Sequence, residues 1–187
     1  TPGGGIAESY NKKLMEWQKP KYAGKRVFGE DMGDLFHELV SDELIDRVLY
    51  GFASAPDVTF QVLTKRAKRM RNYSQEWSLI EAKGLPFMDG MSWPPPNIWW
   101  GTTVENQRWA DERIPLLLDT PAAVRFLSCE PMLGPIHLGT ENCYVNSTDK
   151  KDRRIDWLIC GGESGSKHRP FNPDWARALL HQSRAPG

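Results

Sequence analysis

Cysteine is scarce in this sequence and long apolar runs are missing, and both facts narrow what the protein can be. The 187 residues include 3 cysteines, at positions 129, 143 and 160, which are too few and too scattered for a disulfide framework or a zinc site. No window approaches the roughly 18 consecutive apolar residues of a membrane-spanning helix. Residues 1–13 lack the charged-then-apolar pattern of a secretion signal. We therefore expect a cytoplasmic protein with reduced thiols, no membrane partner and no bound metal on these residues.

An excess of charge of either sign is also missing. The 24 Lys and Arg residues balance 24 Asp and Glu residues, giving a formal net charge of zero, which argues against a generally basic nucleic-acid binder. Charge gathers locally, because Lys65–Arg71 places five cations in seven positions. Such a cluster can bind phosphate, nucleic acid or a cofactor carboxylate, or it can be the solvated start of a helix. Lys65 and Arg66, next to an apolar run, are the better binding candidates.

Five short apolar runs predict buried β-strands. They end at residues 29, 63, 100, 127 and 160, so successive ends lie 27 to 37 residues apart, which is the length of one strand, one crossover helix and a loop. This rhythm predicts an α/β fold: a partial (βα) barrel with parallel strands and about five units, similar to a TIM barrel, in a single domain over 1–187. The runs are Arg26–Gly29, Val58–Leu63, Ile98–Trp100, Val124–Leu127 and Ile155–Cys160.

Helical patterns occupy the gaps between these runs. Ser41 can cap one helix, Asn106–Leu118 is a second that Pro115 should break or kink, and Asn172 with Pro173 opens a third. Residues 72–97 and 139–154 interrupt the rhythm and are interpreted as insertions. Five units are fewer than a complete barrel contains, and the last helix is followed by no strand, so we expect a fragment. The open sheet edges of a partial barrel make a homo-oligomer a further expectation.

Polar residues follow the ends of the predicted strands. In parallel α/β folds these positions build the site, so Asp34, Glu105, Glu130 and Glu163 should meet at one barrel mouth and bind a small molecule there. The alternative is that Glu105, Glu130 and Glu163 only cap helices or pair with Lys65 and Arg66. Gly161–Gly165 (GGESG) is the most site-like segment, because its glycines allow backbone N–H groups to approach a ligand.

Four longer strings together resemble one family: DMGDLFHE (31–38), FQVLTKRAKRM (60–70), TVENQRWADERIPLLLDTPAAVRFLSCEPMLGPI (103–136) and IDWLICGGESGSKHRPFNPDW (155–175). This is the phage and prophage family of uncharacterised proteins called after gene products thirty-seven and sixty-eight, and the resemblance runs from about residue 25 to the end. That family is similar to radical S-adenosylmethionine (SAM) enzymes. The resemblance implies a partial βα barrel and an N-terminal cysteine motif that holds a [4Fe–4S] cluster and cleaves SAM reductively.

Carried over position by position, the resemblance implies Glu130 and Glu163 as catalytic residues. It implies that SAM is held by Asp34, Lys65, Arg66, Glu105, Asn106, Gly161, Gly162, Ser164 and Arg169. Residues 1–25 contain no cysteine, so the chain as given departs from the family at its cluster motif. We therefore expect no cofactor in this chain, with SAM and [4Fe–4S] expected for a full-length parent that carries the cysteines upstream.

Two other functions remain open on the sequence. One is a cluster-free barrel enzyme for a phosphorylated or amine-bearing metabolite, with Glu130 or Glu163 as general base and Lys65 and Arg66 as an anion clamp. The other is a nucleic-acid-binding module that uses the cations of Lys65–Arg71, although the zero net charge argues against it.

Overall fold

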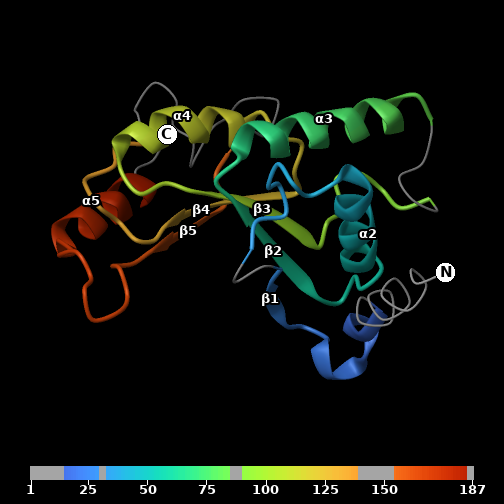
Figure 1. Ribbon diagram of the computed structural model, residues 1–187, viewed down its shortest axis with the longest axis horizontal. Coiled ribbons are helices and arrows are strands. Elements are labelled where there is room, and N and C mark those ends of the chain that lie inside the picture. Colours follow the sequence, from blue (N-terminus) through green and yellow to red (C-terminus); the bar gives the residue numbers. More distant parts are fainter. Residues whose placement is uncertain (1–14, 30–32, 85–89, 139–153, 185–187) are drawn as a thin grey trace.

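The computed structural model describes residues 15–29, 33–84, 90–138 and 154–184, which fold around a five-stranded sheet. All neighbouring strands are parallel, and their order in space is their order in the chain. The sheet curls into a half-barrel, so the predicted α/β class with parallel strands is confirmed (Figure 1). The strands are β1 (Arg26–Phe28), β2 (Thr59–Thr64), β3 (Ile98–Thr103), β4 (Val124–Cys129) and β5 (Trp157–Cys160).

Helices lie along the sheet, and α3 and α4 run side by side (Figure 1). None of the helices in the described ranges is long and apolar enough to cross a membrane. Residues 72–82, interpreted from the sequence as the start of an insertion, belong to α3, which connects β2 to β3. The other expected insertion, 139–154, lies outside the described residues except for Arg154. The elements are η1 (Met15–Gln18), η2 (Pro20–Tyr22), α2 (Asp42–Ala53), α3 (Ala67–Ala82), α4 (Gln107–Leu118) and α5 (Pro173–Arg184).

Side-chain caps begin two of these helices. Ser41 Oγ accepts a hydrogen bond from the Leu44 N–H at 3.3 Å, and Asn106 Oδ1 accepts one from the Trp109 N–H at 3.3 Å. The expected break at Pro115 is absent, because α4 continues through it. Pro115 and Asp111 are both exposed, so water can bond the Asp111 carbonyl that a proline leaves without its helical donor.

The two faces of the sheet differ in what covers them. On one face, alternate strand residues such as Phe60 and Trp100 are fully buried and pack with helix residues such as Leu49 in one core. The opposite face, which we call the inner face, carries the intervening residues, and helices do not cover it in Figure 1. There Phe28 and Trp157 are each 41% exposed. The core of the molecule therefore lies between the sheet and its helices.

Candidate functional site

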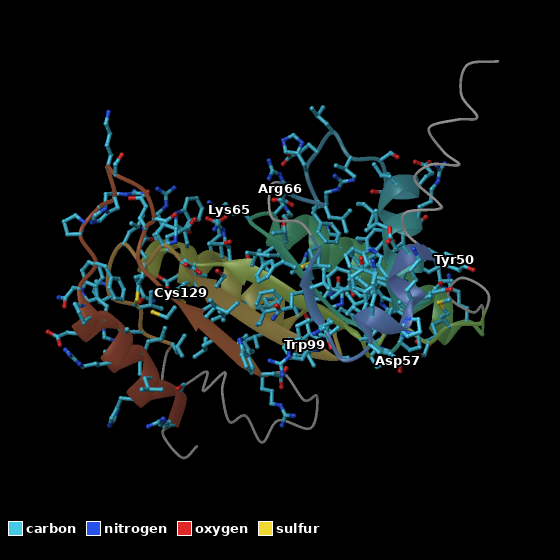
Figure 2. The ribbon with its side chains drawn as sticks, turned by 90° about the horizontal axis from the view of Figure 1, so that it is seen from below. Tyr50, Asp57, Lys65, Arg66, Trp99 and Cys129 are labelled. Carbon is cyan, nitrogen blue, oxygen red and sulfur yellow. The ribbon has the colours of Figure 1, made fainter. Side chains whose placement is uncertain are left out.

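The carboxyl ends of the five strands lie along one edge of the sheet, which we call the strand-end edge. Lys65 and Arg66 follow β2, Glu105 and Asn106 follow β3, Glu130 follows β4, and the Gly161–Ser164 segment follows β5. Figure 2 shows Lys65 and Arg66 together at one end of the sheet, with Trp99 and Asp57 at the opposite end. The topology thus brings the residues that follow neighbouring strands to one edge, as the parallel arrangement requires.

Glu105 is the centre of a buried charged group at this edge. Its side chain pairs with two cations: Lys65 Nζ lies 3.1 Å from Oε1, and Arg113 Nη1 donates to Oε2 at 3.2 Å. Arg113 also donates to the Thr103 carbonyl at 2.7 Å, and its guanidinium carbon lies 4.0 Å from the centre of the Trp109 ring. Glu105 is 7% exposed and Arg113 6% exposed, so each charge compensates for the burial of the other.

Asp34 and Arg66 form a second charged group, which fixes the loop before α2. Asp34 accepts hydrogen bonds from the Thr64 hydroxyl at 2.6 Å and from Arg66 Nη1 at 2.8 Å. Arg66 Nε donates to Glu38 at 2.8 Å, and the Glu38 and Asp34 carboxylates raise the pKa of Arg66. Arg69 donates to the carbonyl of Val40 at 2.6 Å and to Asp42 at 2.7 Å. Arg66 and Arg69 therefore tie this loop to the start of α3.

Glu163 is bound by one arginine across the loop that follows β5. The Arg169 Nε donates to Oε2 at 2.8 Å and Nη2 donates to Oε1 at 2.6 Å, a two-bond arrangement that Arg favours with carboxylates. The backbone N–H of Arg169 adds a third bond at 2.8 Å. These bonds hold the pKa of Glu163 down at about 2. The neighbouring Ser164 is exposed.

Glu130 differs from the other three carboxylates predicted at the edge, because no cation pairs with it in the described part of the chain. It is exposed at the end of β4, against the start of the segment that follows β5. A Cβ at Gly161 would lie 2.9 Å from Glu130 Oε1, so glycine allows this carboxylate to approach the backbone of the next strand. A Cβ at Gly162 would lie 3.0 Å from the Cβ of Phe171. Glu130 is therefore an exposed carboxylate supported by glycine.

The two described thiols do not form a metal centre. Cys129 and Cys160 are register partners on β4 and β5, and the Cys160 thiol lies 3.6 Å from the Met132 sulfur. Burial raises the pKa of Cys129 to about 12, so its thiol is protonated at neutral pH. No group of three or more His, Cys, Asp or Glu side chains in the described ranges could hold a metal ion. Cys143 lies outside the described residues.

An aromatic surface lines the inner face of the half-barrel. The guanidinium of Arg26 lies over the rings of Trp99 and Trp157, 5.4 and 5.1 Å from their centres. The Phe28 ring meets the Phe126 ring edge-on at 6.3 Å. Exposed aromatic groups on one concave face are typical of surfaces that bind a ligand or a partner.

A cavity of about 350 Å³ opens between the start of α3 and the middle of α4. Sequence reasoning singled out Lys65 and Arg66 in its wall but missed Arg113. The sequence pattern that could have identified Arg113 is its position in α4, where it shares the buried face of Ala110, Ile114 and Leu117. A second cavity, of about 290 Å³, is lined by residues 54–58 and lies before β2, at the other end of the sheet.

Comparison with known proteins places the chain in one uncharacterised group. A family model described as "Protein of unknown function (DUF5131)" matches residues 6–187, which is nearly the whole sequence. No curated protein and no solved structure matches the chain.

Proposed function

The chain belongs to the DUF5131 family of proteins of unknown function, and on that premise we propose that it is the SAM-binding core of a radical-SAM-like enzyme. The observation that carries the proposal is Glu130, an exposed carboxylate without a cation in the described part of the chain, beside Gly161 at the strand-end edge. The kinship with phage and prophage proteins and the likeness to a TIM barrel, both predicted from the sequence, are parts of the same proposal.

The strand-end edge offers a group for each charge of the methionine part of SAM. Glu130 is suited to accept hydrogen bonds from the ammonium group, and Gly161 leaves room for close approach to the backbone. Lys65, whose side chain is 57% exposed, is suited to meet the carboxylate. A free carboxylate and an exposed lysine at one edge thus fit the ammonium and carboxylate groups of SAM.

The described residues do not fit a [4Fe–4S] cluster, which in a radical-SAM enzyme supplies the electron for cleavage of SAM. Cys129 is buried and protonated, and Cys160 is its register partner on β5. The proposal therefore requires cluster thiolates from outside the described residues. What it assigns to this chain is the binding and orientation of SAM at the strand-end edge, with Glu130 and Glu163 beside the ligand.

Measurement of SAM affinity by isothermal titration calorimetry tests this assignment. We expect Glu130→Gln to weaken SAM binding by about tenfold or more, because a charged hydrogen bond is worth about 1.5–3 kcal/mol. Glu76→Gln is the matched control, since Glu76 is exposed on α3 and the same charge is removed. The proposal would be contradicted if SAM at millimolar concentration did not bind the wild-type chain. It would also be contradicted if Glu130→Gln bound SAM as tightly as the wild type does.

One observation favours a second function, a cluster-free barrel enzyme for an amine-bearing or phosphorylated metabolite. Both carboxylate oxygens of Glu163 accept hydrogen bonds from Arg169. No cation pairs with Glu130 in the described part of the chain, so Glu130 can accept a proton as a general base. Anaerobic reconstitution of a full-length parent separates the two functions. Incorporation of iron and sulfide with SAM turnover supports the radical-SAM assignment, and absence of all three favours the cluster-free enzyme.

A further inference from the structure

The cavity between α3 and α4 has strongly cationic walls. Five cationic side chains and two carboxylates line its volume of about 350 Å³. This volume is at the lower end of the range for small-molecule sites in proteins. We propose that the cavity binds the phosphate group of a small phosphorylated ligand. Its wall consists of Glu38, Lys65, Arg66, Ala67, Lys68, Arg69, Asn72, Glu112, Arg113 and Leu116.

Not all five cations are available to a ligand. Arg66 is held by Asp34 and Glu38, and Arg69 by Asp42, so these two arginines neutralise carboxylates of the loop before α2. Lys68 has no hydrogen bond or ion pair within the described residues and is exposed at the cavity wall. One of the two carboxylates in the wall, Glu38, is already paired with Arg66. Lys68 is therefore the free cation of the cavity.

Arg113 is the second observation that points to an anion. It lines the cavity, is 6% exposed, and its buried Nε has no hydrogen-bond partner in the described part of the structure. Such a donor costs free energy unless something accepts from it. A guanidinium group presents its N–H donors in a planar fork that matches phosphate oxygens. Arg113, whose Nη1 is bound to Thr103 and Glu105, thus adds a second positive charge to this wall beside Lys68.

The backbone adds donors from the same side. α3 spans 16 residues and its N-cap residue, Arg66, makes no side-chain cap. The first N–H groups of such a helix lack helical partners and favour negative charge. Ala67 and Lys68, the first two residues of α3, both line the cavity. The cavity wall therefore contains the first N–H groups of α3 and the positively charged side chains of Lys68 and Arg113.

The cavity also adjoins the strand-end edge. Lys65 and Arg113 line it, and both contact Glu105 at the end of β3. The cavity therefore meets the edge at which Glu130 follows β4, the second strand beyond β2. The inference does not depend on SAM or on a cluster, because every group that carries it belongs to α3, α4 and the wall between them.

Titration with inorganic phosphate at constant ionic strength, followed by ¹H–¹⁵N NMR, tests the proposal. We expect amide shifts at Ala67, Lys68 and Arg113 in the wild type, and affinity at least tenfold lower in Lys68→Gln and Lys68→Glu. The matched control is Lys83→Gln, an exposed lysine 15 residues further along the chain and roughly 22 Å from Lys68 by helical rise. Because Lys68 is exposed, these variants should fold as the wild type does, which circular dichroism verifies.

Three results would overturn the proposal. The first is a Lys68→Gln variant that binds phosphate as tightly as the wild type does. The second is a Lys83→Gln variant that loses as much phosphate affinity as Lys68→Gln, which would indicate general charge attraction. The third comes from a single-stranded oligonucleotide as a competing probe. If it binds far more tightly than phosphate and depends equally on Lys68, Arg71 and Lys83, the surface binds nucleic acid and the cavity is not a small-ligand site. Because SAM is absent from all these titrations, failure here leaves the function proposed above untouched.

Discussion

Glu163 owes its low pKa to one neighbour, Arg169. The hydrogen bonds from Arg169 lower the pKa of Glu163 from 4.5 to about 2. A carboxyl whose folded-state pKa is lowered stabilises the fold fully above its ordinary pKa, and this contribution is lost as the pH falls through about 2. We expect the Glu163 carboxyl carbon to titrate near pH 2 by NMR, and Arg169→Gln to return the midpoint toward 4.5.

A midpoint near 4.5 in the wild type would contradict this pairing. The Arg169→Gln variant also tests the loop geometry, since Arg169 spans the loop between β5 and α5.

Residue pairs at the strand-end edge could be predicted only in part. The sequence indicated that Glu105 and Lys65 follow neighbouring strands, and such residues must share an edge in a parallel sheet. Arg113 was missed, because its contact with Glu105 depends on how α4 packs back on β3. The pairing of Glu163 with Arg169 likewise depends on the path of a loop, which residue spacing does not specify.

Among the elements, α2, β2 and β3 are joined by the buried side chain of Asn97. Its Nδ2 donates to the carbonyls of Phe52, Ala55 and Val58 at 2.8, 3.0 and 3.1 Å, and the residue is 8% exposed. We expect Asn97→Ala to lower the free energy of unfolding by about 3 kcal/mol, because buried carbonyls lose their donor. Urea denaturation measures the change.

The control for Asn97 is Asn72→Ala, which removes an exposed amide from α3 and should change stability by less than about 0.5 kcal/mol. Equal stability of Asn97→Ala and the wild type would show that these three hydrogen bonds contribute nothing to the fold.

The extent of the elements was harder to predict than their existence. The apolar runs located all five strands, but β3 and β4 continue into Gly101–Thr103 and Ser128–Cys129, which are small or polar. Pairing with neighbours extends them, since Gly101 pairs with Leu63 and Phe126. α4 continues through Pro115 for a similar reason: Ile114 and Leu117 bury its inner side, and this packing overrides the local preference.

For the molecule as a whole, the inner face depends on the close fit of Gly101 under Phe126. A Cβ at Gly101 would lie 2.4 Å from the Phe126 ring, which is itself fully buried. We expect Gly101→Ala to destabilise the fold by about 1–3 kcal/mol, since overpacking forces the ring out of place. Thermal or urea unfolding measures this loss.

A double-mutant cycle separates this clash from a general cost of alanine in a strand. The combination Gly101→Ala with Phe126→Leu should cost less than the sum of the two single changes, because the smaller side chain makes room for the new methyl group. Strict additivity would contradict the fit inferred from the geometry.

The even spacing of the apolar runs predicts the sequential parallel sheet, but it does not predict that aromatic side chains of the inner face are partly exposed. Spacing of 27 to 37 residues between strand ends indicates repeated βα units and parallel neighbours. Alternation along Trp99, Trp100 and Gly101 does not reveal which side the helices will cover, because both sides carry aromatic or small residues. The half-barrel therefore follows from the sequence pattern, and the exposure of Trp157 follows from the placement of the helices.

Strand order that repeats chain order has a consequence for how the protein is made. Each strand from β2 onward pairs with the strand that precedes it in the chain, so one of its partners has already been synthesised when it is made. The order in which the strands are synthesised is therefore the same as their order in the sheet.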